Sequence, residues 1–263
     1  MEHARAFEAA RTLTSARRSG ERLESLPAEL TPADHADGYQ IQDLVVTCHG
    51  REVGAWKIGA THPNSQKVLG SDIPVAARLF SECLVSGDTT VEDRLVVRGL
   101  EAEYAFLLGK DLPPQGAPYS REDIEAAIAS VHPSIEVVDT RFTGPQAGSM
   151  AIADNVNDCC WVYGAGVDDW KSVDILTARV TMEVNREVVV EGDGREVLGD
   201  PINALMWLVN EHANSREGLR SGQYVTCGSC TGLYKAPAGC DARATFEGLG
   251  EVNVKFRSQG SPR

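Results

Sequence analysis

The stretch from Leu100 to Leu112 (LEAEYAFLLGKDL) constrains the fold more than any other part of the sequence. Side chains alternate between the two faces of a β-strand, so Glu101 and Glu103 share one face while Ala102 and Tyr104 occupy the other. The apolar run after the acids indicates a strand that enters a core. Two carboxylates on one face of a mostly buried strand repel each other and lose hydration. They therefore require a cation, a shared proton or a solvent-filled cleft.

Two interpretations of this strand are open at this point. Carboxylate oxygens are hard ligands that favour Mg²⁺, Mn²⁺ or Ca²⁺ over Zn²⁺, which predicts a divalent-metal site with Glu101 and Glu103 as half of it. Alternatively, the two acids belong to an edge strand and simply face water, because antiparallel sheets commonly have one wet face.

A third acid strengthens the metal hypothesis. Glu136 lies between β-branched residues in the run Pro133–Asp139, where the core of a strand is expected. Three oxygen ligands from two strands leave coordination positions open for substrate and water. Taken alone, Glu136 is also explained by a pair with a lysine or arginine, since buried acids are usually paired.

Lys57 is the basic residue that stands out, because it lies inside the run Val53–Gly59 between Trp56 and Ile58. Burial would lower the pKa of this lysine, and a nearby carboxylate would raise it again. The alternative is an edge lysine whose stem covers apolar surface while its ammonium group stays in water.

Composition excludes several classes of function. The chain has 263 residues, 42% of them hydrophobic and 24% charged, as in an ordinary globular protein with a sizeable core. A formal net charge of -13 argues against nucleic acid or an anionic membrane as partner, since both require a basic surface. The sequence shows no apolar run of spanning length and no signal peptide, so we expect a cytoplasmic protein. Seven cysteines are an odd count, which favours reduced thiols, and the single CxxC at Cys227–Cys230 supplies only half of a zinc site.

The chain divides into a helical and a β-rich part. Apolar positions recur at helical spacing from Glu2 to Ser25, and Thr31–Asp34 starts a second helix with Pro32 at its first position. After Gly50 the pattern changes to short β-like runs. We therefore expect an α+β fold, with a helical N-terminal cap over residues 1–50 and a mostly β catalytic domain over residues 51–263.

Together these segments resemble the 2-keto-4-pentenoate hydratase and 4-oxalocrotonate decarboxylase family, within the fumarylacetoacetate hydrolase superfamily. The specific part is the E-x-E strand followed by the I-E-x-x-D strand, and the match runs in order along nearly the whole chain. The matching segments are Gly38–Gln42, Trp56–Thr61, Leu69–Asp72, Leu100–Phe106, Ile135–Arg141, Ile152–Asn155, Gly199–Pro201, Leu219–Gly222 and Phe246–Gly250.

The resemblance implies a helical N-terminal segment packed on a mostly β, fumarylacetoacetate-hydrolase-type domain, in a homo-oligomer. It implies that Glu101, Glu103 and Glu136 bind Mg²⁺ or Mn²⁺. The implied activity is that of a metal-dependent lyase in aromatic catabolism, acting on an unsaturated 2-oxo or 2-hydroxy carboxylic acid. Foremost is a hydratase of the 2-hydroxypenta-2,4-dienoate type that works through a metal-bound dienolate. The alternative is a decarboxylase of the 4-oxalocrotonate type with the same metal site, and either could associate with a pathway partner enzyme.

The resemblance also implies roles for five further residues. Lys57 would lie near the substrate, as an acid/base group or as a partner of its carboxylate. Thr231 and its turn, including Ser229, would help to hold the substrate carboxylate. Asp72 or Asp139 would tune the proton transfer by Lys57.

One position departs from the family pattern. Hydratases that resemble this chain carry an acid for proton transfer in a P-D-F-G-like stretch after the G-x-D turn, and Val75 occupies that place here. This departure favours the alternative of a decarboxylase activity. It also motivates a further hypothesis, a non-catalytic subunit that stabilises an active oligomer. A C–C hydrolase of the acylpyruvate type would need a His–Glu pair to activate water, for which His62 and His132 are the candidates near the motifs.

Overall fold

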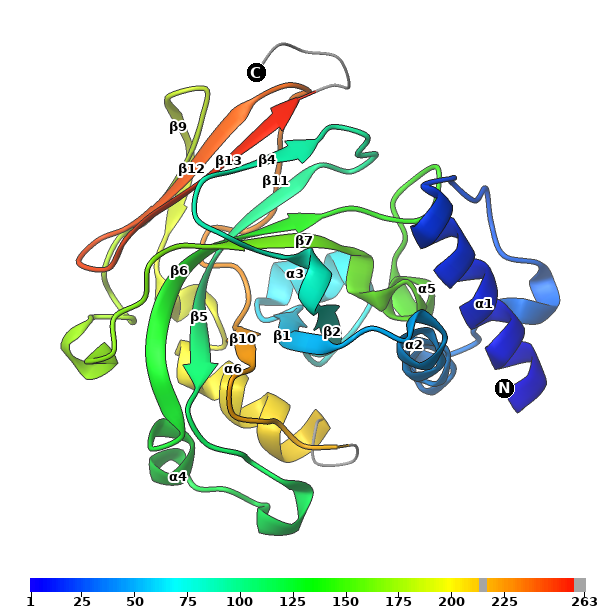
Figure 1. The fold of residues 1–263 in the computed structure, drawn as a ribbon, viewed down its shortest axis with the longest axis horizontal. Coiled ribbons are helices and arrows are strands. Elements are labelled where there is room, and N and C mark those ends of the chain that lie inside the picture. Colours follow the sequence, from blue (N-terminus) through cyan, green and yellow to red (C-terminus); the bar gives the residue numbers. More distant parts are fainter. Residues whose placement is uncertain (213–216, 258–263) are drawn as a thin grey trace.

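Two β-sheets form the body of the molecule, and the N-terminal helices lie beside the larger one (Figure 1). The computed structural model describes residues 1–212 and 217–257. The strands are β1 (Val53–Gly59), β2 (Val75–Phe80), β3 (Leu84–Ser86), β4 (Thr89–Glu92), β5 (Gly99–Leu108), β6 (Ile128–Val138), β7 (Asp158–Tyr163), β8 (Val180–Val184), β9 (Glu187–Gly192), β10 (Tyr224–Thr226), β11 (Tyr234–Lys235), β12 (Asp241–Phe246) and β13 (Gly250–Arg257). The helices are α1 (His3–Ser19), α2 (His35–His49), α3 (Pro63–Leu69), α4 (Arg121–Glu125), α5 (Gly148–Ala153) and α6 (Pro201–Trp207).

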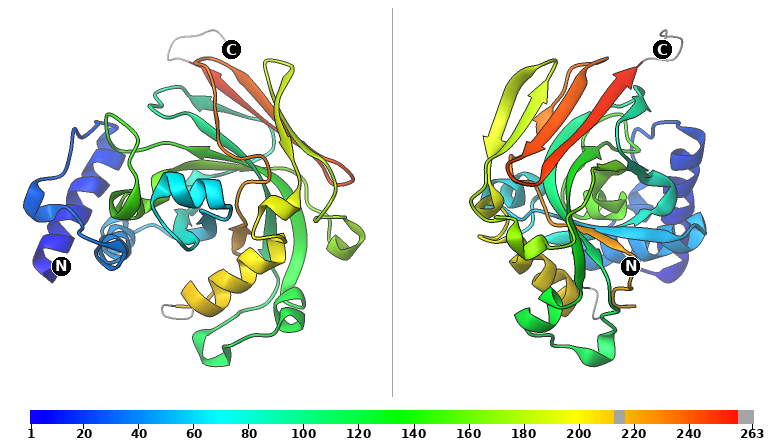
Figure 2. Two further views of the ribbon diagram at one scale, coloured as in Figure 1. Left: turned by 180° about the vertical axis from the view of Figure 1, so that it is seen from behind. Right: turned by 60° about the vertical axis from the view of Figure 1, so that its left-hand side comes forward.

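The large sheet has the strand order β2-β1-β10-β5-β6-β7-β3, with β11 also paired to β5, and the small sheet has the order β4-β13-β12-β8-β9. The large sheet curls, and β6 is visibly bent along its length (Figure 1). Figure 2 shows from two further sides that α1 and α2 lie on one side of the large sheet and the small sheet on the other.

Strand β5 lies inside the large sheet, between β10 and β6. Its residues Ala102, Tyr104 and Phe106 belong to the main core, where the Tyr104 ring lies 4.9 Å from that of Phe246 in β12. The predicted alternation along this strand is therefore confirmed. The alternative of an edge strand with acids in water is wrong, because β5 is paired on both sides and Glu103 is only 1% exposed.

The N-terminal segment contains two long helices, as predicted. Helix α1 ends at Gly20, whose φ of 74° gives the left-handed cap that glycine favours. Helix α2 begins later than predicted, so Pro32 is not its first residue. Asp34 caps it instead, because the Asp34 carboxylate accepts a hydrogen bond from the backbone N–H of Asp37 at 2.9 Å.

Helix α2 is fastened to the β-rich part by two features. A Cβ at Gly38 would come within 2.6 Å of the Ser149 carbonyl oxygen, so only glycine allows α2 to approach α5 this closely. The buried amide of Gln42 donates to the carbonyls of Ala76 in β2 and Ile152 in α5, each at 3.1 Å. The helical segment thus contacts β2, which pairs with β1, and α5, which leads into the turn at residues 155–157.

The predicted α+β class, with N-terminal helices followed by a mostly β part, is confirmed, whereas a domain boundary at residue 50 stays a prediction. All seven cysteines are free thiols. Within the described ranges, no helix is both long and apolar enough to cross a membrane.

Candidate active site

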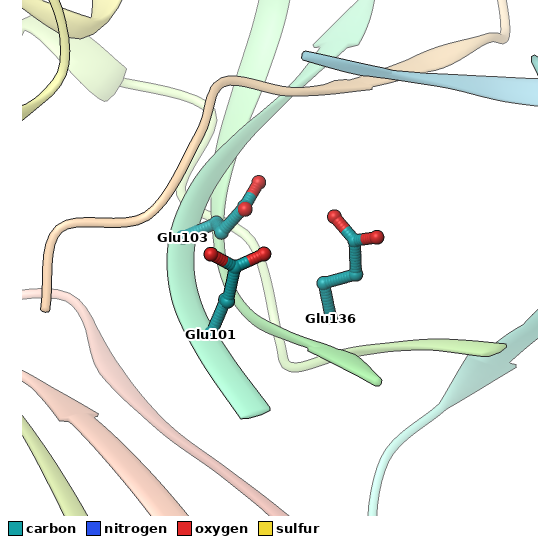
Figure 3. A group of neighbouring side chains, drawn as sticks. All are labelled: Glu101, Glu103 and Glu136. Atoms are coloured by element: carbon teal, nitrogen blue, oxygen red, sulfur yellow. The ribbon is translucent and has the colours of Figure 1, made fainter. Parts of the chain in front are cut away.

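Three glutamates from two adjacent strands converge on one face of the large sheet (Figure 3). Glu101 and Glu103 lie on β5, and the antiparallel register places Glu136 of β6 directly opposite Glu101. One oxygen of each carboxylate lies within 4.8 Å of the other two. Among the residues that the structure describes, this is the only such group of three His, Cys, Asp or Glu side chains.

Burial and mutual repulsion disfavour ionisation of these carboxylates. Burial raises the pKa of Glu101 to about 7, with the charge of Glu136 adding to the rise and that of Lys57 opposing it. The pKa of Glu103 lies well above its usual range, through burial first and then through the charges of Glu136 and Glu101. Oε2 of Glu136 is buried without a hydrogen-bond partner. The cluster fits a hard divalent cation, which would offset the repulsion and coordinate that oxygen.

Glu103 is held in place by two donors, one at the end of β10 and one in the turn that follows it. Its Oε2 accepts a hydrogen bond from the Thr226 hydroxyl and another from the backbone N–H of Gly228, at 3.0 Å. Gly228 has a φ of +102°, and a Cβ there would come within 2.3 Å of Oγ1 of Thr61. Glycine is therefore required at the position that supplies this N–H.

Sequence reasoning missed Thr226 and Gly228 and selected their neighbours in the same segment. Ser229 Oγ is buried without a hydrogen-bond partner, and Thr231 Oγ1 lies 3.3 Å from the carbonyl oxygen of Gly232. The role of these two residues toward a substrate carboxylate stays a prediction. The sequence could not point to Thr226, because Thr226 reaches the site through the parallel pairing of β10 with β1, opposite Lys57. That pairing joins residues far apart in the chain.

Lys57 is 2% exposed and forms an ion pair with Glu136. Its ammonium group also donates to the carbonyl oxygen of Val156 at 2.9 Å. Burial alone lowers the pKa of Lys57, but the charge and hydrogen bond of Glu136 outweigh this effect, so the pKa is raised overall. The alternative of a lysine with its ammonium in water is wrong. Glu136 both pairs with a lysine and belongs to the carboxylate cluster.

A strained turn presents the carbonyl of Val156 to Lys57. Asn155, Val156 and Asn157 all have φ values of 54°, a left-handed conformation that is unfavourable for a β-branched valine. The Asn155 amide donates to the Arg78 carbonyl at 2.8 Å and anchors the turn. Such strain persists only where the surroundings enforce it, and it is concentrated at functional sites.

A network of buried charges around Asp158 acts on Lys57. Asp158 is fully buried and forms ion pairs with Arg141 and with Arg17 of α1. Burial raises the pKa of Asp158, but the charges of Arg17 and Arg141 outweigh it and lower the pKa overall. The charge of Asp158 in turn helps to keep Lys57 protonated. The N-terminal helix therefore contributes directly to the electrostatics of the site.

The two aspartates predicted to assist Lys57 lie in different surroundings. The buried carboxylate of Asp139 accepts hydrogen bonds from the backbone N–H groups of Val96 and Val97, each at 2.8 Å, and from Arg22 at 2.6 Å. These contacts occupy both of its oxygens. Asp72 is exposed in the turn between α3 and β2. A part for either aspartate in proton transfer stays a prediction.

A His–Glu pair, which could not be located in the sequence, is formed by His62 and Glu196, whose side-chain atoms Nε2 and Oε2 lie 3.4 Å apart. His62 also caps α3, with Nδ1 accepting from the backbone N–H of Asn64 at 3.2 Å, so the proton of a neutral ring lies on Nε2. Both members of the pair are substantially exposed. His132 instead contacts Ser130 and the Gly164 carbonyl.

No protein-family model matches the chain. The chain is 30% identical over 253 residues to 2-keto-4-pentenoate hydratase 1 of Dechloromonas aromatica (strain RCB), which covers 94% of this chain and 95% of the relative. It is 28% identical over 226 residues to the 4-oxalocrotonate decarboxylase of Pseudomonas putida, covering 84% and 85% of the two chains. A solved structure of 4-oxalocrotonate decarboxylase from Pseudomonas putida G7, complexed with magnesium and adipate, has a TM-score of 0.88 at 24% identity, over 98% of this chain and 99% of that one. This similarity confirms the predicted type of fold.

Proposed function

Since the chain belongs to the 2-keto-4-pentenoate hydratase and 4-oxalocrotonate decarboxylase family of the fumarylacetoacetate hydrolase superfamily, we propose that it is a divalent-metal-dependent hydratase of the 2-hydroxypenta-2,4-dienoate type. Its general class, a lyase that acts on 2-oxo acids, follows from family membership. The observation that carries the finer proposal is the cluster of the half-buried Glu101 with the buried Glu103 and Glu136, together with Lys57, which pairs with Glu136.

The three glutamates would hold Mg²⁺ or Mn²⁺. Oε2 of Glu136, which has no hydrogen-bond partner, and the raised pKa values of Glu101 and Glu103 support this assignment. The magnesium in the related decarboxylase structure supports it as well. When bound, the cation supplies Lewis acidity that stabilises negative charge developing on a 2-oxo acid. Thr226 and Gly228 fix the orientation of Glu103, and such partners of ligands contribute strongly to metal affinity.

Lys57 is the group that would move the proton. It is held as a cation between Glu136 and the Val156 carbonyl, so its ammonium has both a fixed position and a proton to give. It could protonate a substrate carbon or pair with the substrate carboxylate. Because Lys57 is buried, its electrostatic interaction with a negative charge on the substrate would be stronger than in water.

A decarboxylase of the 4-oxalocrotonate type is the second candidate, and the likeness to the Pseudomonas putida decarboxylase supports it. It would use the same glutamates and the same lysine, and would differ in the end of the site remote from the metal. A non-catalytic subunit is disfavoured, because a subunit without activity has no chemical need for three buried charged groups, Lys57, Glu103 and Glu136, beside the half-buried Glu101. Assembly as a homo-oligomer stays a prediction.

The two activities are separated by two assays with Mg²⁺. The hydratase proposal expects loss of the dienol absorbance of 2-hydroxypenta-2,4-dienoate and no release of CO₂ from 4-oxalocrotonate. Release of CO₂ without hydration would favour the decarboxylase, and inactivity in both assays with a full complement of metal would overturn both.

A further inference from the structure

Strand β7 carries two consecutive cysteines, Cys159 and Cys160, at an irregularity of the large sheet. In the pairing with β6, Cys160 lies opposite Val137, whereas the next pair joins Asp158 to Val138. Cys159 therefore has no partner residue on β6 and is the extra residue of a β-bulge. Neighbouring side chains of a regular strand point to opposite faces, but a bulge re-aims one of them and can turn both to the same face.

Packing and hydrogen bonding show that the two thiols lie together on one face. Both cysteines pack against the main core. The next residue, Trp161, lies opposite Glu136 and belongs to a separate apolar cluster on the other face. The Cys160 thiol donates a hydrogen bond to the sulfur of Cys159, which lowers the pKa of Cys159 although burial opposes this effect. The bulge thus creates a pair of contacting thiols.

This pair is more accessible than the dithiol that the sequence motif suggests. Cys159 and Cys160 are free and half-buried, whereas Cys227 and Cys230 of the CxxC segment are fully buried. The lowered pKa of Cys159 favours the thiolate, which is the form of cysteine that acts as nucleophile and ligand.

The geometry of the pair restricts the kind of ligand that it can hold. Thiols select soft ions, but zinc requires four ligands. In the part of the chain that the structure describes, the glutamate cluster is the only group of three or more such ligand atoms within 4.8 Å, so no third ligand completes the thiol pair. A linear two-coordinate ion such as Cu(I) holds its sulfurs on opposite sides, farther apart than thiols in hydrogen-bond contact. Trivalent arsenic is pyramidal and holds two sulfurs side by side.

We propose that Cys159 and Cys160 form a dithiol binding site for trivalent arsenic, taken up as arsenite. Each thiol displaces one hydroxyl group of As(OH)₃. Two S–H and two As–O bonds break, two As–S bonds form, and each displaced hydroxyl leaves with a thiol proton as water. Arsenic stays trivalent and keeps its third hydroxyl, so the reaction needs no oxidant or reductant. The site does not depend on the proposed function, because neither thiol belongs to the glutamate cluster.

Counting bound arsenic tests the site in the folded, Mg²⁺-loaded protein. The protein is reduced with a phosphine, which does not compete as a dithiol would, and titrated with arsenite under native mass spectrometry. We expect one arsenic per chain. Cys159→Ser and Cys160→Ser should each weaken binding at least about 100-fold, because the second As–S bond is intramolecular. Cys83→Ser is the matched control, since this half-buried thiol directly precedes β3, the strand paired with β7, and it should bind like the wild type.

X-ray absorption at the arsenic edge adds a test that needs no variant. The proposal expects two sulfur ligands and one oxygen ligand on arsenic bound to the wild type. A shell of three sulfurs, or no arsenic on the wild type, would overturn it. Undiminished binding by both Cys159→Ser and Cys160→Ser would place the arsenic elsewhere, and loss of binding in Cys83→Ser would show that a different pair of thiols holds it.

Discussion

The ammonium group of Lys57 and the carboxylate of Glu136 form a buried ion pair between strands that are not neighbours in the sheet. Strands β10 and β5 lie between β1 and β6, so in a flat sheet the two backbones would be about 14 Å apart. The curl of the large sheet brings the side chains together. A bound cation would have to share Glu136 with Lys57, so the charge of the lysine would oppose the binding of that cation.

Replacing Glu103 by glutamine should abolish metal-dependent activity. The side chain keeps its shape and loses its charge, and we expect Mg²⁺ affinity to fall by more than about 100-fold, because even the partners of ligands contribute roughly 10- to 100-fold. Calorimetric titration with Mg²⁺ measures the loss. Glu187→Gln, at an exposed position of β9, is the control and should change nothing. Full activity of Glu103→Gln with bound metal would exclude Glu103 as a ligand.

The metal-free protein should lose stability as the pH rises from 6 to 8. The pKa of Glu101 is about 7 in the folded state against an ordinary value of 4.5, so the folded protein keeps a proton that the unfolded chain has released. This contribution to stability is complete below pH 4.5 and is lost as the pH rises through 7. Between pH 6 and 8 the loss is about 1.4 kcal/mol.

Urea denaturation of the EDTA-treated protein measures this slope. Other groups titrate in the same range, so the relevant quantity is the difference from Glu101→Gln, which should lack this component. Mg²⁺ affinity should rise about tenfold over the same interval, because the cation displaces the proton. A pH slope shared equally by the wild type and Glu101→Gln would show that Glu101 does not hold this proton.

Lys57→Met should inactivate the enzyme and destabilise its metal-free form. The substitution keeps an unbranched side chain but leaves Glu136 without its buried partner, which costs about 3 kcal/mol in typical cases. Mg²⁺ should restore part of the loss, since it offsets the charge of Glu136. Unfolding free energies with and without Mg²⁺ test this, with the exposed Lys255→Met as control. A metal-free variant as stable as the wild type would contradict a net stabilising role for the pair.

Thr226→Val should weaken metal binding while the fold is preserved. The change is nearly isosteric and removes the hydroxyl group that donates to Glu103. We expect Mg²⁺ affinity to fall about 10- to 100-fold, as for other partners of metal ligands. Excess Mg²⁺ should recover much of the activity, which a general defect in folding would not allow. Thr90→Val, on the exposed side of β4, provides the matched comparison.

The sequence identified the glutamate cluster because strand alternation and burial are local properties. Glu101 and Glu103 are two residues apart, and the run around Glu136 is short and strongly β-like. Thr226, Gly228 and the Val156 carbonyl were missed for a different reason. Gly228 and Val156 act through backbone groups, which leave no pattern of residue types in the sequence. Thr226 reaches the site through the pairing of two segments that are distant in the chain, in which it lies opposite Lys57. The curl of the sheet, which closes the site, is equally invisible in the sequence.

The ion pair between Arg17 and Asp158 bears on how such enzymes can be recombined. A chimera that replaced α1 by the first helix of a relative would retain Asp158 and Arg141 but would lose Arg17, one of the two cations that pair with Asp158, wherever that helix has no arginine there. The Asp158 carboxylate would then be less fully neutralised, although it is buried deep in the β-rich part of the molecule and its charge acts on Lys57. Functional exchange of this helix should therefore depend less on its overall sequence similarity than on an arginine at the position of Arg17.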